Sequence, residues 1–148
     1  MKFALLIAAS TLLLGSAAQS QVNPGNLKWG PAPPFLPRGA QAAVLAGDPG
    51  RPGQFTIRLR FPPGYAVAPH THPADEHVTV ISGQLSLGMG QRVRPRRMAT
   101  LVAGGFANAG AGMAHYVSTR SGAIVQVTSQ GPFAVNYVNP ADDPRRHR

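Results

Sequence analysis

The 148-residue sequence contains no cysteine. This absence excludes a disulfide framework, a thiolate metal site and a cysteine nucleophile. Acidic residues are also scarce, because five Asp and Glu stand against 14 Lys and Arg, and the formal net charge is +9. A charge of this sign favours phosphate, a membrane surface or another anion as a partner. The arginines are scattered along the chain, however, with one cluster at residues 92–97 and another at residues 145–148.

Long apolar runs are missing too, apart from one near the N-terminus. After Lys2, residues 3–14 are uncharged and mostly apolar, and small residues follow them. This layout predicts a secretory signal peptide over residues 1–18, with cleavage after Ala18 or Ser20. The run is shorter than the roughly 20 residues of a spanning helix. We therefore expect an exported protein, periplasmic or secreted, with no membrane span after processing and no nucleic-acid partner.

Helical patterning is absent from the rest of the chain. The 17 glycines and 15 prolines break helices, and no apolar period of 3.6 residues is present. Apolar and polar residues alternate instead, most clearly over residues 54–61. Turn-forming residues separate most of the predicted strands, which are 41–46, 54–61, 78–81, 84–87, 99–102, 115–119, 123–128 and 133–138. This spacing predicts an all-β sandwich or barrel in one domain.

The predicted domain covers residues 41–139. A Pro- and Gly-rich arm, residues 19–40, precedes it, and a charged tail, residues 140–148, follows it and should be solvated. The prolines of the arm favour extended backbone. Either Trp29 and Phe35 attach the arm to the domain or the arm is a loose leader.

One segment holds the residue types of a metal site. His70 and His72 would share one face of a strand, because alternate residues point the same way. Residues 73–75 can turn the chain, so that Glu76, the only glutamate, returns to the same place. Two imidazoles and a carboxylate directed at one point are a ligand set for a divalent metal. The alternative is that these are surface residues of a polar loop.

The same segment resembles a known family. Residues 64–83 fit the first motif of the cupins, G-x5-H-x-H-x3-E-x6-G, without a substitution. A weaker match to the second motif, G-x5-P-x-G-x2-H-x3-N, is formed by Gly104, Gly110, Gly112, His115 and Thr119. Gly110 and Thr119 replace the usual Pro and Asn of that motif. The chain is similar to small exported single-domain cupins.

The resemblance implies a fold and a ligand set. The fold would be a double-stranded β-helix, a jelly-roll-like barrel with little helix. One divalent transition metal would be bound by His70, His72, Glu76 and His115. Nitrogen and oxygen donors suit Fe, Mn, Ni, Co, Zn or Cu, and affinity does not choose among them. Cupins commonly pair, so a homodimer is possible.

Five further side chains are weaker candidates. As the neighbour of Glu76, His77 should point to the opposite, outer face. Tyr65 and Tyr116 could reach the pocket, although packing is the commoner role of an aromatic residue in a barrel. Arg58 and Arg60 share a strand face and could clamp an anionic substrate if that face turned inward. A solvated outer face is the alternative that we favour.

Two functions from different classes fit this sequence. The first is a mononuclear metalloenzyme acting on a small molecule, either dioxygenase-like or isomerase- or decarboxylase-like. The second is a non-catalytic module that binds metal or a small ligand. A basic anion-binding protein ranks last, with the arginines of residues 92–97 expected in a solvated hairpin loop.

Overall fold

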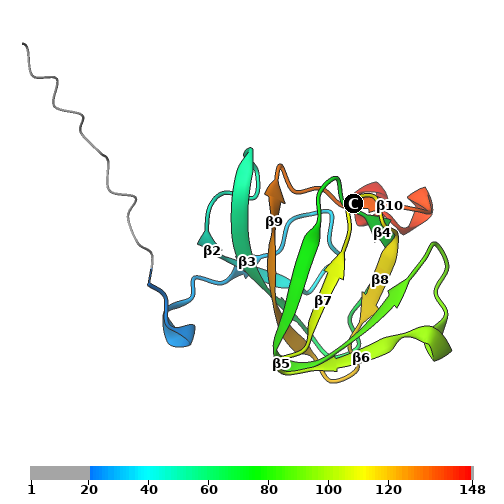
Figure 1. Ribbon diagram of the computed structural model, residues 1–148, viewed down its shortest axis with the longest axis horizontal. Coiled ribbons are helices and arrows are strands. Elements are labelled where there is room, and N and C mark those ends of the chain that lie inside the picture. The colour runs from blue at the N-terminus through cyan, green and yellow to red at the C-terminus, as the bar shows by residue number, and fades with distance from the viewer. Residues whose placement is uncertain (1–20, 148) are drawn as a thin grey trace, which may run out of the picture.

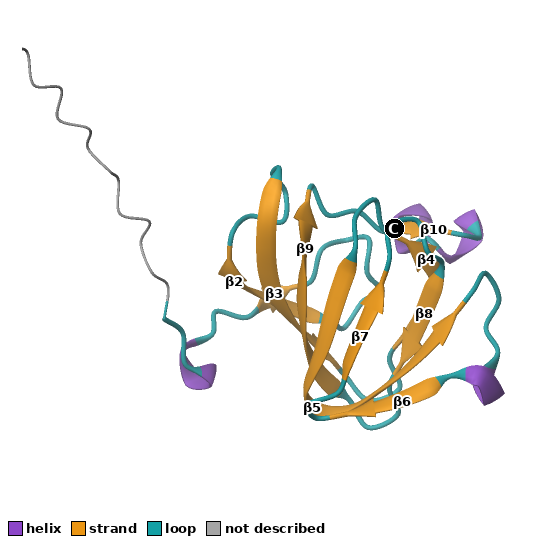
Figure 2. Ribbon diagram, viewed as in Figure 1, coloured by secondary structure: helices purple, strands orange, loops and turns teal. Residues whose placement is uncertain are grey.

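The computed structural model describes residues 21–147, so the predicted signal peptide lies outside the described residues. Ten strands and four short 3-10 helices form the described part of the chain (Figure 1; Figure 2). The strands are β1 (Gly30–Pro31), β2 (Gln41–Ala46), β3 (Gly53–Phe61), β4 (Ala66–Thr71), β5 (Glu76–Met89), β6 (Ala99–Val102), β7 (Phe106–Ala109), β8 (His115–Ser118), β9 (Ala123–Gly131) and β10 (Asn136–Tyr137). The helices are η1 (Pro24–Asn26), η2 (Pro95–Arg97), η3 (Pro140–Asp142) and η4 (Pro144–His147).

All strand pairs are antiparallel, and the sheet curls into the barrel that the resemblance implied. The strand order is β1-β2-β3-β9-β5-β8-β4-β10, with β6 and β7 both paired to β5. The all-β prediction is confirmed. Among the described residues, no helix is long and apolar enough to span a bilayer.

Strand β5 belongs to both halves of the barrel. Its first part pairs with β7 and β9, and its last part pairs with β6 and β8. Gly83 lies between these parts with φ +75°, and a Cβ there would collide with the carbonyl oxygen of Gly122. Glycine is therefore required where the strand passes from one half to the other.

Alternation along the strands builds the core. In β3, Phe55, Ile57, Leu59 and Phe61 are all buried, whereas Arg60 between them is exposed. Strand β9 pairs with β3 along its whole length and contributes Val125 and Val127 to the same cluster. The inner faces of the sheet thus enclose an apolar interior.

The arm lies against the barrel. Strand β1 pairs with β2, and the Trp29 ring lies 4.1 Å from the guanidinium carbon of Arg60. The carbonyl oxygen of Phe35 accepts a hydrogen bond of 2.8 Å from the Tyr137 hydroxyl, and Leu36 belongs to the buried core. Of the two alternatives left open by the sequence, these contacts favour the one in which Trp29 and Phe35 attach the arm.

Three strand predictions differ from the structure. Residues 78–81 and 84–87, expected as two strands, are parts of the single strand β5, because Gly83 continues the strand instead of ending it. Residues 133–138 form a strand only at Asn136–Tyr137, and the rest of the segment is loop. Strand β7 was not expected.

In the tail, Arg145 pairs with Asp143 at 2.7 Å and donates to the Val135 carbonyl.

Candidate metal centre

The four residues of the two motifs come together inside the barrel. His70 lies on β4, His72 directly follows β4, Glu76 begins β5 and His115 begins β8. The register pairs His70 with His115 across β4 and β8. All four are buried, with 4%, 3%, 7% and 1% of their surfaces exposed, respectively. They are therefore not the surface residues of a polar loop.

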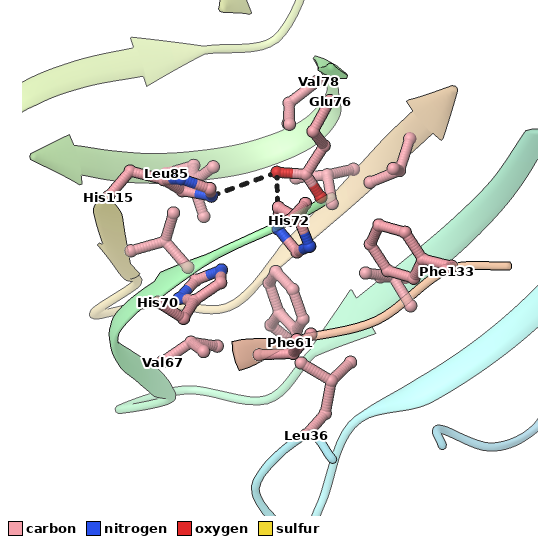
Figure 3. A pocket seen from close by; sticks show the side chains of 15 residues that line it. Leu36, Phe61, Val67, His70, His72, Glu76, Val78, Leu85, His115 and Phe133 are labelled. Atoms are coloured by element: carbon pink, nitrogen blue, oxygen red, sulfur yellow. Dashed lines mark hydrogen bonds and ion pairs between the residues drawn. The ribbon is translucent and has the colours of Figure 1, made fainter. Parts of the chain in front are cut away.

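Their side chains converge on a small volume (Figure 3). One ring nitrogen from each of His70, His72 and His115 lies within 4.8 Å of the other two, so these three residues could hold a metal ion. Oε2 of Glu76 lies 3.2 Å from Nε2 of His115 and 3.4 Å from Nε2 of His72. The carboxylate thus adds an oxygen beside two of the three imidazoles.

Backbone carbonyls fix the orientation of each imidazole. Nδ1 of His70 lies 2.7 Å from the oxygen of Ala68, and Nδ1 of His72 lies 2.7 Å from the oxygen of Ala134. In the same way, Nδ1 of His115 lies 3.0 Å from the Met113 oxygen. A carbonyl can only accept, so each Nδ1 carries a proton, and in the neutral imidazole Nε2 then presents its lone pair to the interior. This is the outer-shell arrangement of metal-ligating histidines.

The electrostatics favour an anionic carboxylate beside imidazoles. Burial would raise the pKa of Glu76, but its contacts with His115 and His72 lower that pKa below its usual range. Burial and the neighbouring His115 lower the pKa of His70 to about 4, so this ring is neutral at pH 7. Burial lowers the pKa of His72, but the adjacent Glu76 carboxylate raises it by more, so the pKa of His72 lies above its usual value.

These residues fit a divalent cation. Nε2 of His72 is buried and has no hydrogen-bond partner among the described residues. Lone pairs on the imidazole Nε2 atoms and a carboxylate oxygen just over 3 Å away repel one another unless a proton or a cation lies between them. Three nitrogens and one oxygen, with no sulfur, are the donors that divalent transition metals accept.

The interior around these residues is a cavity of about 40 Å³. Its other lining residues are all apolar: Leu36, Leu59, Phe61, Val67, Val78, Leu85, Val117, Val125, Val127, Phe133 and Val135. An apolar wall lowers the local dielectric constant and strengthens the interactions of any charge held at the centre.

The weaker candidates lie elsewhere. Tyr65 stacks on Phe61 and donates to the carbonyl of Pro37 at 2.7 Å, so it is a packing residue. The Tyr116 hydroxyl accepts a hydrogen bond of 2.8 Å from a backbone amide in the loop between β5 and β6. His77 is exposed on the outer face.

Both candidate arginines also point away from the cavity. Arg58 donates to Oε1 of Gln126 at 3.4 Å. Arg60 donates to Oε1 of Gln41 at 3.0 Å and covers the Trp29 ring. The inward anion clamp considered from the sequence is therefore absent from the described part of the chain.

Two residues of the cavity wall were missed by the sequence reasoning. Phe133 stacks on the His72 ring, with centroids 4.7 Å apart and an interplanar angle of 15°. Leu36 reaches the same cavity from the arm. No sequence pattern indicates either contact, because both residues lie in loops without an alternating period.

Comparison with known proteins supports the same interpretation of the fold. A sequence model of the ChrR cupin-like domain matches residues 17–118. No curated protein sequence gives a significant match. Among solved structures, the polyketide cyclase RemF from Streptomyces resistomycificus is similar with a TM-score of 0.69 and 18% identity, covering 88% of this chain and 92% of that one.

Two further structures share the fold. A putative acetylacetone dioxygenase from Methylibium petroleiphilum PM1 has a TM-score of 0.67 and 20% identity, with 90% of each chain covered. The oxalate decarboxylase of Lactobacillus farciminis has a TM-score of 0.56 and 14% identity, covering 80% of this chain and 34% of that one. At these identities the similarity shows the fold alone.

Proposed function

The chain belongs to the family of ChrR cupin-like domains, and from this premise we propose that it is a mononuclear metalloenzyme acting on a small molecule. The proposed ligands are His70, His72, Glu76 and His115. The proposal rests chiefly on one observation: three buried imidazoles have Nδ1 held by a backbone carbonyl and Nε2 directed inward. A bound divalent transition metal would supply Lewis-acid and redox chemistry at this point.

The proposed reaction type is that of a dioxygenase. Apart from the four proposed ligands, the described cavity wall contains no side chain that could donate or accept a proton. A reaction that depends on a separate general acid or base has no residue for that role here. The contribution of the chain is to orient the metal-binding groups and to exclude water through its apolar wall.

Export, and assembly as a homodimer, are separate proposals. Export is supported by the apolar segment and small residues near the N-terminus, and N-terminal sequencing of the secreted or periplasmic protein would test cleavage after Ala18 or Ser20. The homodimer is supported only by the family resemblance. Sedimentation equilibrium of the mature protein would distinguish one copy from two.

Metal analysis tests the proposed centre directly. Mature protein purified without a His tag should bind about one equivalent of divalent metal, and Glu76→Gln should bind far less. Asp142→Asn is the matched control, because it removes the same charge from an exposed position and should retain the wild-type metal content. Equal metal content in wild type and Glu76→Gln would contradict the proposed ligand set.

Turnover separates the enzyme from a binding module. We expect O₂ uptake that depends on an added small molecule and is lost in His72→Ala. Stoichiometric metal binding without turnover across a broad panel of small molecules would instead support a non-catalytic module that binds metal or a small ligand.

A further inference from the structure

The lining of the cavity restricts what can enter it. Apart from His70, His72, Glu76 and His115, the side chains of residues 21–147 that line the cavity are all apolar. A second charged or strongly polar group on a bound molecule would therefore lose its hydration without gaining a partner in the wall, which is costly. Arg58 and Arg60, the two residues considered from the sequence as partners for an anion, point outward.

A larger apolar groove lies next to this cavity. Its volume is about 400 Å³, and it is bounded by the arm, by strands β2 and β3 and by the turn around Pro49. Leu36, Leu59 and Phe133 line both the groove and the cavity. These side chains thus form a shared wall between the proposed metal centre and the outer groove.

The shared wall is held by side-chain packing and by backbone hydrogen bonds, among them one of 2.7 Å from the Phe133 amide to the Pro49 carbonyl. The Phe133 ring meets Phe35 and Phe55 edge-on, with centroids 6.0 and 5.2 Å away, and stacks on His72. Leu36 sits in a short turn of the arm, where its amide donates to the Pro33 carbonyl at 2.9 Å. Leu36 and Phe133 both lie outside the strands, so displacement of their side chains by a ligand would leave the strand pairs in place.

We infer that the site takes a small molecule with one metal-binding polar end and an uncharged, apolar remainder, which extends past Leu36 and Phe133 into the groove. This inference rests on the proposed function, because the polar end needs the metal. Leu36 and Phe133 then determine how long the apolar part can be. The apolar end of the same ligand would occupy the groove, because the cavity and the groove are both lined by Leu36, Leu59 and Phe133.

A series of chelators of increasing length tests the inference. The probes are acetohydroxamic, butanohydroxamic, hexanohydroxamic and octanohydroxamic acids, titrated into Co(II)-loaded protein and followed by visible absorption. Affinity should rise about three- to fourfold for each methylene added to the hydroxamate, as long as that methylene is buried in the protein. Adipic acid monohydroxamate, which has six carbons and a terminal carboxylate, should bind about tenfold or more weakly than hexanohydroxamic acid.

Substitutions of the wall locate the apolar end. Leu36→Ala should strengthen binding of the longest hydroxamate and leave acetohydroxamic acid unchanged. The control is Val44→Ala, at an exposed position that lines only the groove. It should change the ratio of the affinities for long and short hydroxamates less than Leu36→Ala does. Since Leu36 is buried, Leu36→Val provides a milder variant, and the thermal midpoint of each variant is measured alongside.

Failure of the inference differs from failure of the proposed function. Co(II) binding of about one equivalent together with affinity independent of length, or unaffected by the terminal carboxylate, overturns the inference alone. Absence of Co(II) binding contradicts the proposed function. In that case metal-free protein is titrated with 1-hexanol and 1,6-hexanediol, and the methyl NMR signals of Leu36 are followed. Shifts with 1-hexanol alone support the apolar compartment, and equal shifts or none overturn it.

Discussion

Nδ1 of His72 lies 2.7 Å from the carbonyl oxygen of Ala134, a residue 62 positions further along the chain. The loop between β9 and β10 therefore orients a ring that the β4 segment carries. The adjacent residue in that loop, Phe133, stacks on the same ring. Both contacts fix His72 with its Nε2 toward His70, His115 and Glu76, as metal ligation requires.

Removal of this ring should abolish metal retention. His72→Ala is expected to lower metal affinity at least a hundredfold, because it removes a donor and its carbonyl-anchored orientation. The measurement is metal content after dialysis against a weak chelator. His77→Ala is the matched control, since that imidazole is exposed on the outer face. Equal metal loss in both variants would show that binding is not specific to the buried cluster.

Gly83 should be intolerant of any side chain. Its φ of +75° alone makes alanine about 1–2 kcal/mol less favourable, and the Cβ would also collide with the Gly122 carbonyl. We expect Gly83→Ala to lower the free energy of unfolding in urea by about 3 kcal/mol or more. Gly104→Ala separates the two effects, because φ there is +85° but no atom lies within 4 Å of the Cβ position. Equal losses in the two variants would argue against the collision.

The Thr119 hydroxyl should contribute nothing to stability. It is buried, and Oγ1 has no hydrogen-bond partner within the described chain. Thr119→Val should leave the free energy of unfolding unchanged or raise it by up to about 1 kcal/mol, because an unsatisfied polar group is removed. Ser129→Ala should instead lower it by about 1 kcal/mol, since Oγ of Ser129 donates to the Asp75 carbonyl at 2.7 Å. Thermal or urea denaturation followed by circular dichroism measures both.

Stability should fall at alkaline pH because of Tyr65. Burial raises the pKa of Tyr65 well above 10, and the nearby Tyr137 raises it further. Above pH 10 the unfolded chain releases this proton while the folded chain keeps it, so the folded state binds more protons and loses stability as pH rises. One such proton corresponds to a slope of up to about 1.4 kcal/mol per pH unit. Urea titrations at pH 9–11 should show a shallower fall in Tyr65→Phe than in wild type, and identical slopes would contradict the assignment.

The sequence predicted the elements that depend on local alternation. Residues 54–61 have a period of two, and β3 spans Gly53–Phe61 with its apolar residues inward. Within the segment 133–138, which is mostly apolar, the strand prediction was right for Asn136–Tyr137 and wrong for residues 133–135. Phe133 and Val135 are in fact loop residues that fill the interior.

The candidate site was predictable in its ligand-type residues but not in its surroundings. His70, His72 and Glu76 are close in sequence, and His115 follows from the second motif. The carbonyls of Ala68, Met113 and Ala134 have no side-chain signature, because a backbone oxygen can belong to any residue. The approach of Leu36 depends on how the arm folds back, which composition does not determine.

Strand β5 carries Glu76 at its start and pairs with strands of both halves of the barrel. Neither half can separate from the other without breaking hydrogen bonds on this one strand. Melting should therefore occur as a single cooperative event, with the slowest-exchanging amides on β5 requiring global opening of the protein. Glu76, as part of β5, should then become accessible to solvent only when the whole protein unfolds.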